Sequence, residues 1–294
     1  MSGTLYVVAT PIGNCADITE RARTILRDVD IIAAEDTRTT QVLLNMLDIR
    51  NKMVSNHKFN EQQQLDHLLS ELNNGKNVAV VSDAGTPCIS DPGSVIVKGA
   101  VAMNIPIIGV SGPTAVITAL SISGFSFDHF AFYGFVSRKD KELRNHLMNI
   151  KSGMIPISVF FESPHRIIKT IGVIADIFPE AELCLCNDLT KMFERVYRGT
   201  PTEIEQQLND NPNAGKGEYT LVMNTSACPR TSEVSTEITK EALLVDHMIT
   251  NRCSSKEAIV ALTEKYRGKI SRKEFYTASL NLKEHFDAIV NELI

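Results

Sequence analysis

The sequence predicts an α/β protein of two domains, a parallel sheet in the first and a mixed sheet in the second, followed by a small helical domain. Through residues 1–124, apolar runs alternate with helical patterns, as they do in βαβ units. Through residues 125–226, strand patterns follow one another with fewer helices between them. Residues 237–294 show helical periodicity, with a break at 267–271. A length of 294 residues is sufficient for this organisation.

In the first domain, apolar runs predict strands at 4–9, 30–34, 52–55, 78–81 and 106–110. Helical spacing predicts helices at 17–28, 38–47, 60–73, 94–103 and 113–121. Asp17 is the expected N-cap of the first helix, and Pro113 opens the last one in its first turn.

In the second domain, which follows a linker at 124–127, we expect strands at 129–135, 157–162, 182–186, 194–199 and 218–224. Helices are expected at 139–150, 164–178 and 202–208. Ser163 and Pro164 have the residue types of an N-cap and a first helical position. Residues 225–237, rich in Ser, Thr and Pro, predict a linker to the helical domain.

The composition excludes several classes of protein. Hydrophobic residues make up 43% of the chain, and no apolar run approaches the ~20 residues of a membrane span. The first residues enter a predicted strand without a basic region, so we expect no secretory signal, no membrane association and a cytoplasmic location. The six cysteines form no CxxC pair, which predicts free thiols and no metal site. A net charge of −5 gives no global argument for nucleic acid binding.

Four strand ends of the first domain carry unusual loops, at 10–14, 35–38, 82–93 and 111–114. The carboxyl ends of parallel strands lie along one edge of a sheet, so these loops are expected to converge on one crevice. The segment 82–93, hereafter the 82–93 loop, is the longest and contains Gly85, Pro87, Pro92 and Gly93. A long solvated connection is the alternative interpretation. Neither GxGxxG nor GxxxxGK[ST] is present, which argues against dinucleotide and P-loop sites.

Three charged segments also lie at strand ends. In the segment 35–38, two carboxylates and Arg38 suit either a ligand site or a helix N-terminus capped by Asp36 or Thr37. The segment 161–166 contains Glu162, His165 and Arg166, which capping does not explain. The segment 187–195 carries several charged side chains, and a solvated hairpin is its alternative interpretation.

Together, several motifs resemble one family: Thr10-Pro-Ile-Gly-Asn14, Ala34-Glu-Asp-Thr-Arg38, the 82–93 loop, Gly112-Pro113, Phe161-Glu-Ser-Pro-His-Arg166, Leu189-Thr-Lys191 and Gly217-Glu218. They occur in the order and spacing of the tetrapyrrole-methylase-like S-adenosylmethionine transferases, and they are similar to the ribosomal RNA small subunit methyltransferase I branch. The resemblance covers residues 4–224. The segment 258–282 resembles, more weakly, the helix-turn-helix at the end of that branch.

This resemblance implies a two-domain tetrapyrrole-methylase-like fold with S-adenosylmethionine in the cleft between the domains. It implies 2′-O-methylation of a cytidine ribose in the decoding region of 16S ribosomal RNA. The partner is then 16S ribosomal RNA or the small ribosomal subunit, and a homodimer is implied as well. The alternatives are a methylase for a small tetrapyrrole-like molecule and a non-catalytic sensor of the cofactor. Gly85-Thr86-Pro87, where tetrapyrrole methylases carry Gly-Asp-Pro, favours RNA.

The candidate site residues follow from the motifs and the resemblance. Candidates for catalysis or substrate alignment are Glu35, Glu162, His165, Lys191 and Glu194. Candidates for cofactor binding are Ile12, Asp83, Gly85, Thr86, Pro87, Ile89, Ser111, Thr114, Ala115, Gly217 and Tyr219, and Asp91 offers negative charge to the ammonium group or to loop amides. Candidates for RNA binding are Arg38, Lys139, Arg166, Arg267, Lys269, Arg272 and Lys273.

The sequence also departs from the family pattern at two places. Asn187-Asp188 stands where the family has Arg-Glu, so the chain lacks any contact that the arginine carries. Val136-Ser137 stands where the family has Leu-Pro.

Overall fold

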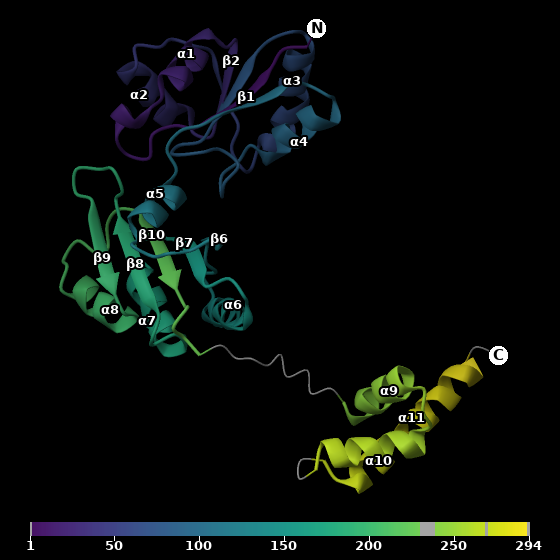
Figure 1. Cartoon of the computed structure of the whole chain (residues 1–294). Coiled ribbons are helices and arrows are strands. Elements are labelled where there is room, and N and C mark those ends of the chain that lie inside the picture. The colour runs from purple at the N-terminus through teal and green to yellow at the C-terminus, as the bar shows by residue number, and fades with distance from the viewer. Residues whose placement is uncertain (1, 230–238, 268–269, 293–294) are drawn as a thin grey trace. The chain divides into compact units, whose positions relative to one another are not determined.

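The computed structural model describes residues 2–229, 239–267 and 270–292, with side chains described as far as residue 283 (Figure 1). The chain forms two compact units, Met1–Arg230 and Thr231–Ile294. The first unit contains both predicted sheets and the second contains the predicted helical tail. The linker predicted at 225–237 lies partly outside the described residues. The division of the first unit near residue 124 stays a prediction.

The first sheet is parallel throughout, in the strand order β3-β2-β4-β1-β5. Its strands are β1 (Leu5–Val8), β2 (Ile31–Ala34), β3 (Met53–Ser55), β4 (Val78–Val81) and β5 (Ile107–Val110). Its helices are α1 (Glu20–Asp28), α2 (Thr37–Met46), α3 (Glu61–Asn73), α4 (Ser94–Ala102) and α5 (Ala115–Ile122). The strand order reverses around β1 and β4, so the loops after these strands meet near the middle of the sheet edge.

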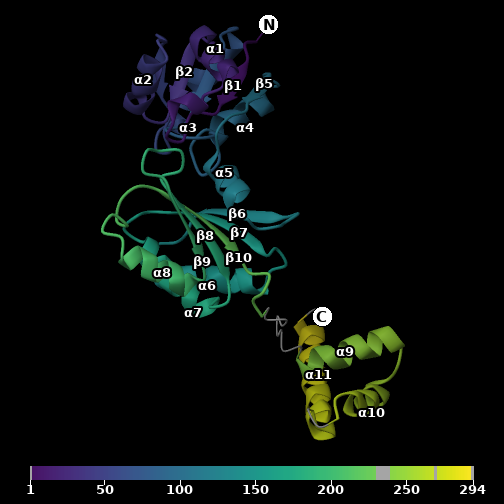
Figure 2. The same ribbon diagram turned by 60° about the vertical axis from the view of Figure 1, so that its left-hand side comes forward.

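Helices cover both faces of this sheet (Figures 1 and 2). On β4, Ala79 and Val81 pack with α1 and α2, while Val78 and Val80 pack with α3 and α4. Because neighbouring side chains of a strand point to opposite faces, a strand covered on both sides must be apolar at every position. This is why β2 and β4 are continuous apolar runs in the sequence.

The second sheet is mixed, in the strand order β6-β7-β10-β8-β9. Its strands are β6 (Phe130–Phe135), β7 (Ile157–Glu162), β8 (Glu182–Asn187), β9 (Arg195–Gly199) and β10 (Tyr219–Asn224). Only β6 and β7 pair in parallel; the other neighbours are antiparallel. Helices α6 (Asp140–Ser152), α7 (Ile167–Ile177) and α8 (Pro201–Asn209) pack on one face. The expected mixed sheet is confirmed.

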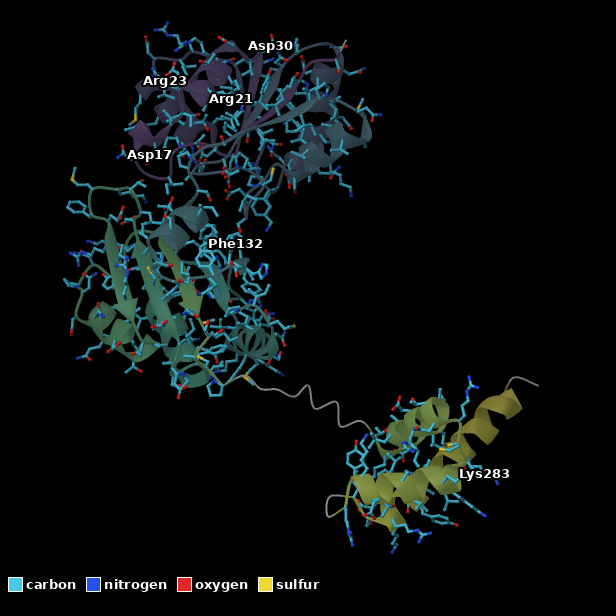
Figure 3. All side chains as sticks on the ribbon, in the orientation of Figure 1. Asp17, Arg21, Arg23, Asp30, Phe132 and Lys283 are labelled. Carbon is cyan, nitrogen blue, oxygen red and sulfur yellow. The ribbon has the colours of Figure 1, made fainter. Side chains whose placement is uncertain are left out.

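Helix α5 follows the last strand of the first sheet but packs on the second sheet. Its Val116, Ala119 and Leu120 share one apolar cluster with Ile157 and Val222 of the second sheet. On the same face, the ring of Phe132, labelled in Figure 3, meets the ring of Phe161 edge-on with centroids 4.9 Å apart. The cluster also takes in the expected buried thiols of Cys184 and Cys186, which lie on one face of β8.

Three predicted helix starts are wrong, those of α1, α5 and α7. Asp17 ends a short 3-10 helix (Cys15–Asp17), and α1 begins at Glu20 because the Thr19 hydroxyl accepts the Ala22 amide proton at 3.1 Å. Pro113 precedes α5 rather than lying in its first turn.

Helix α7 begins at Ile167, three residues later than Ser163 and Pro164 suggested. The Ser163 amide donates to Glu162 Oε1 at 2.8 Å, and the Ser163 carbonyl accepts from the amides of Arg166 and Ile167. Residues 163–166 therefore form a turn that points the Arg166 side chain back toward Glu162.

The second unit consists of α9 (Lys240–Asn251), α10 (Ser255–Lys265) and α11 (Arg272–Glu292). Leu244, Leu262 and Phe275, one from each helix, lie in its small core. Ser254 with Glu257, and Ser271 with Glu274, form reciprocal hydrogen bonds at the starts of α10 and α11. Across residues 2–229, 239–267 and 270–292, no helix is long and apolar enough to cross a membrane.

Candidate active site

A pocket of about 300 Å³ lies where the loops of the first sheet meet the strand ends of the second. The first sheet contributes Ile12 after β1, part of the 82–93 loop after β4, and Thr114 and Ala115 after β5. The second sheet contributes side chains from the ends of β6 and β7, the loop after β8 and the start of β10. The lining residues are Ile12, Ala84, Gly85, Thr86, Ile89, Asp91, Thr114, Ala115, Phe135, Phe161, Glu162, Ser163, Pro164, Leu189, Glu218, Tyr219 and Thr220.

Main-chain hydrogen bonds join the loops that wall the pocket. Thr10 and Gly85 exchange a pair of backbone hydrogen bonds, at 2.9 and 3.1 Å, which ties the loop after β1 to the 82–93 loop. The Thr86 hydroxyl lies 3.4 Å from the Pro113 carbonyl oxygen, next to the loop after β5. Three of the four strand ends expected to converge therefore line one pocket.

The fourth strand end lies beside the pocket without lining it. The Asp83 amide donates to Glu35 Oε2 at 3.3 Å, and the Asp36 amide donates to Asp83 Oδ1 at 3.1 Å. Asp36 also caps α2 by accepting the Arg38 amide proton at 2.8 Å. Hydrogen bonds from the Arg38 guanidinium and amide lower the pKa of Asp36 to about 2. The capping interpretation of this segment is confirmed.

The 82–93 loop is held in an unusual backbone conformation. Its residues Gly85, Cys88, Ser90 and Gly93 all have positive φ, and two of them are not glycine. A non-glycine residue in this region is strained by about 1 to 3 kcal/mol, and such strain concentrates at functional sites. The Gly93 amide donates to Glu61 Oε2 of α3 at 3.0 Å.

Strand β6 approaches the 82–93 loop through Gly134. This glycine has φ of +64° and lies at the register shift between β6 and β7. A Cβ at this position would lie 2.7 Å from the Ser90 hydroxyl oxygen, so only glycine allows this approach.

Three carboxyl groups gather along the first-sheet side of the site. Burial first, and then the negative charge of Glu35, raise the pKa of Asp91 to about 6. Burial also raises the pKa of Glu35 and of Asp83, and each of these is raised further by neighbouring carboxylates. Of these three groups, Asp91 lines the pocket.

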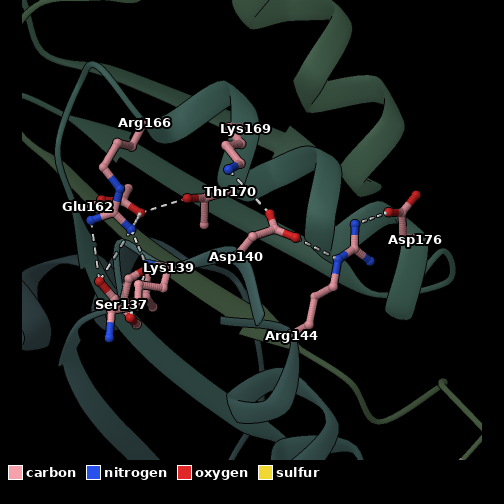
Figure 4. A network of polar contacts seen from close by, with 10 residues as sticks. Ser137, Lys139, Asp140, Arg144, Glu162, Arg166, Lys169, Thr170 and Asp176 are labelled. Carbon is pink, nitrogen blue, oxygen red and sulfur yellow. Dashed lines mark hydrogen bonds and ion pairs between the residues drawn. The ribbon is translucent and has the colours of Figure 1, made fainter. Parts of the chain in front are cut away.

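Glu162 and Arg166 belong to a hydrogen-bonded network (Figure 4). The Glu162 side chain is 1% exposed; its Oε2 accepts from the Thr170 hydroxyl at 2.6 Å and lies 3.2 Å from Arg166 Nη2. The same guanidinium donates to the carbonyls of Val136 at 3.3 Å and Ser137 at 2.7 Å. These acceptors are backbone carbonyl oxygens, which every residue type has. The presence of Val136-Ser137 in place of the family's Leu-Pro therefore leaves these hydrogen bonds possible.

The loop between β8 and β9 is held by charged side chains. Lys191 Nζ lies 2.9 Å from both Asp188 Oδ1 and Glu218 Oε2. Burial lowers the pKa of Lys191, but its hydrogen bonds to these two carboxylates raise it more, so the side chain is a cation. Glu194 accepts the Thr190 amide proton. A side chain at Gly217 would collide with the Asp188 carboxylate.

The pocket brings together most, but not all, of the predicted cofactor residues. Those that line it are Ile12, Gly85, Thr86, Ile89, Thr114, Ala115 and Tyr219. The lining does not include Asp83, Pro87, Ser111 or Gly217. Of the predicted catalytic residues, only Glu162 lines the pocket, and His165 is exposed in the turn before α7. The individual roles of all these residues stay predictions.

The residues predicted to bind RNA occupy different settings. The side chains of Arg38, Lys139 and Arg267 are 89%, 79% and 82% exposed, but each is paired with an acidic neighbour. Arg166 is turned inward, as described above. Arg272 and Lys273 are exposed at the start of α11. Lys269 lies outside the described residues.

Several pocket residues were not named as site candidates from the sequence, although Phe161, Leu189 and Glu218 lie in the quoted motifs. Leu189, Phe135, Phe161 and Thr220 supply apolar and hydroxyl surface, and Glu218 supplies a carboxyl group. All of them lie at or next to strand ends of the second sheet. A systematic reading of strand ends in both domains would have found them. In the described part of the chain, no group of three or more His, Cys, Asp or Glu side chains is arranged to hold a metal ion.

Comparison with known proteins relates this arrangement to one superfamily. Residues 4–205 match the model for tetrapyrrole (corrin/porphyrin) methylases. The fold is also similar to uroporphyrin-III C-methyltransferase from Thermus thermophilus in complex with S-adenosylhomocysteine, with a TM-score of 0.53 and 15% identity over 76% of this chain and 97% of that one. Cobalt precorrin-4 methyltransferase gives a TM-score of 0.54 with 15% identity, covering 77% of this chain and 96% of that one.

Relatives with higher identity extend over nearly the whole chain. Ribosomal RNA small subunit methyltransferase I from Neisseria meningitidis serogroup B is 39% identical over 96% of this chain and 95% of that protein. The protein of the same name from Bacillus subtilis is 39% identical over 87% of this chain and 88% of that one. The chain therefore belongs to the tetrapyrrole methylase superfamily and, within it, to the family of ribosomal RNA small subunit methyltransferase I.

Proposed function

We propose that this protein transfers a methyl group from S-adenosylmethionine to the ribose 2′-oxygen of a cytidine in 16S ribosomal RNA. Membership of a family of ribosomal RNA methyltransferases supports the substrate class. The main structural observation in support of the proposal is the charge of the pocket. Three carboxyl groups, those of Asp91, Glu162 and Glu218, line it. The cations paired with Glu162 and Glu218 are not among its described lining residues, and Asp91 is in none of the described ion pairs, so it supplies the negative charge that is not neutralised.

This charge distribution suits S-adenosylmethionine better than a phosphate-bearing ligand. The donor carries a sulfonium and an ammonium, both positive, which a negative site attracts. Backbone amides of the 82–93 loop, near Thr86 and Ile89, are available to its carboxylate, because turns with positive φ form anion-binding concavities. Apolar surface from Ile12, Ala115 and Leu189 suits the adenine ring.

S-adenosylmethionine supplies an electrophilic methyl group on sulfur. The protein then has to hold the 2′-hydroxyl in line with that methyl group and exclude competing water. Orientation of this kind is worth about 7–11 kcal/mol of the barrier, whereas a positioned base adds roughly 10²–10⁴-fold. Positioning therefore contributes more than proton removal. The narrow pocket between the two sheets is suited to this role.

The predicted catalytic residues fit positioning more readily than proton transfer. Lys191 and Glu218 neutralise one another across the loop after β8. Glu194 holds the backbone of the same loop, and Glu35 holds the amide of Asp83. We propose that these residues fix the walls of the pocket. We also propose that the protein works in the cytoplasm as a homodimer, as the family resemblance implies.

The transfer reaction itself is tested with radiolabelled S-adenosylmethionine. We expect label to enter small ribosomal subunits, and one linkage of their 16S ribosomal RNA to become resistant to alkali, because a methylated 2′-oxygen cannot attack the neighbouring phosphate. Uroporphyrinogen III, offered in parallel, should remain unlabelled. Label in the tetrapyrrole alone would identify a small-molecule methylase. Tight cofactor binding without transfer to either substrate would identify a sensor.

The charge of the pocket predicts that Ile89→Arg weakens the binding of S-adenosylmethionine more than the binding of S-adenosylhomocysteine. Ile89 lines the pocket but is 46% exposed, so an arginine can be accommodated there. Its positive charge repels the sulfonium of the first ligand, whereas sulfur in the second is neutral. We expect a difference of roughly tenfold in Kd by calorimetry, about 1.4 kcal/mol. Ile89→Met is the control. An equal loss for both ligands would show that only shape matters at this position.

The Glu162 network predicts that Glu162→Gln mainly lowers stability. The substitution leaves the Arg166 guanidinium without its buried carboxylate partner, which should reduce the free energy of unfolding by about 2–3 kcal/mol in urea denaturation. Glu180→Gln, a change on an exposed glutamate, should leave it unchanged. If Glu162→Gln is as stable as the wild type but inactive in methyl transfer, Glu162 acts on the substrate instead.

The tail is expected to contribute to RNA binding through the start of α11. Replacing Arg272 and Lys273 together by glutamate removes two exposed cations, so affinity for small-subunit RNA should fall. The slope of log affinity against log salt should become shallower by roughly one for each lost phosphate contact. Filter binding at several salt concentrations measures both. The control Arg272→Lys with Lys273→Arg keeps the charge and should bind normally. Unchanged RNA binding in the glutamate variant would show that the start of α11 does not contact RNA.

A further inference from the structure

The pocket contains three carboxyl groups, and two of them already have strong partners. Glu162 accepts hydrogen bonds from Thr170 and Ser163 and is paired with Arg166. Glu218 is paired with Lys191. These contacts hold the carboxylate oxygens against groups of the protein itself, so they compete with any hydrogen bond from a substrate hydroxyl. Neither group is therefore suited to remove a proton from a substrate.

Asp91 is the third carboxyl group, and its setting is different. Its side chain interacts with the Ser82 hydroxyl, and its charged neighbours on the first sheet are the carboxyl groups of Glu35 and Asp83. Across the pocket lie Glu162 and Glu218. Among the described ion pairs, none involves Asp91. The cation Arg38, which acts on the neighbouring Asp83, is bound through two of its nitrogens by Asp36.

The backbone around Asp91 is suited to hold a group in one place. On one side of it, Ser90 has φ of +67° and faces Gly134 of β6. On the other side, the Pro92 carbonyl accepts the Cys88 amide proton at 3.3 Å, and the Gly93 amide is bound by Glu61. The loop is therefore held by hydrogen bonds to α3 and within itself, and it lies close against β6. A rigid support of this kind is what a catalytic group requires.

From this geometry we infer that Asp91 is the general base of the methyl transfer. The inference rests on the proposed function and adds the residue that accepts the proton. As the 2′-oxygen forms its bond to the methyl carbon, the carbon–sulfur bond breaks and its electron pair stays on sulfur. The proton of the 2′-hydroxyl passes to the Asp91 carboxylate and is later released to water.

The electrostatic surroundings of Asp91 agree with this role. Burial, and then the charge of Glu35, raise its pKa to about 6, closer to neutral pH than the usual value of an aspartate. A base is most effective when its pKa lies near the working pH, because it is then both ionised and basic. Since only the ionised form accepts a proton, the transfer rate should rise with pH through about 6 and be lost below it.

The test is the single-turnover rate of methyl transfer to small ribosomal subunits, measured from pH 5 to 8 at saturating S-adenosylmethionine. We expect Asp91→Asn to lower this rate by roughly 10²–10⁴-fold. The rise in rate near pH 6 should disappear even at saturating S-adenosylmethionine, while the Kd for this cofactor should rise by roughly tenfold, because the pocket loses one carboxylate. Asp91→Glu keeps a carboxylate and should recover part of the rate together with the pH dependence. Asp66→Asn, on an exposed side chain of α3, is the control.

The possible outcomes separate the inference from the proposed function. If Asp91→Asn loses cofactor affinity but turns over normally once saturated, Asp91 is a cofactor ligand and not the base. If it retains the wild-type rate and pH profile, the inference is wrong while the function stands. If the wild-type protein labels no ribosomal subunit, the proposed function fails. Measured cofactor binding also shows whether the asparagine variant is folded.

Discussion

The site depends on one apolar cluster that belongs to both sheets. Helix α5 leaves the first sheet and packs its Val116, Ala119 and Leu120 on the second sheet, and Ile12 and Leu189 join the same cluster. Burial of apolar side chains contributes roughly 1.5–3 kcal/mol each, so this cluster is a substantial constraint. Ile12 and Leu189 also line the pocket. The apolar cluster that links the two sheets therefore also forms part of the pocket wall.

The second constraint on the site is electrostatic. Arg166 and Lys191, which pair with the pocket-lining Glu162 and Glu218, are each engaged by carboxylates. Glu162 and Glu218 are neutralised in the process, whereas burial and the negative charges of Glu35 and Asp83 raise the pKa of Asp91. The two sides of the pocket therefore differ: the second sheet offers neutralised pairs, and the first sheet offers charge that is not neutralised. A cationic methyl donor and a hydroxyl nucleophile can be distinguished by such an asymmetric site.

Much of this arrangement could be predicted from the sequence, for identifiable physical reasons. A strand covered on both faces has to be apolar throughout, so β2 and β4 were evident, and the meeting of the loops after β1, β4 and β5 followed from parallel topology. Side-chain partners were not predictable. Nothing local to residues 162–166 indicates that Arg166 turns inward to reach the carbonyls of 136–137. The setting of Asp91 likewise depends on Glu35, a residue 56 positions away in the chain. The helix starts at Glu20 and Ile167 were missed because several adjacent residues are able to cap.

The exchange of hydrogen bonds between Thr10 and Gly85 has a consequence for how this superfamily diversifies. The bonds are made by backbone atoms, so they specify the course of the two loops without specifying the side chains that the loops carry. Position 86, which is threonine, lines the pocket directly after this bridge. One framework can therefore exchange the chemical groups that face its ligand while the wall behind them keeps its shape. The side chains that face the ligand can therefore change without a change in the backbone that positions them.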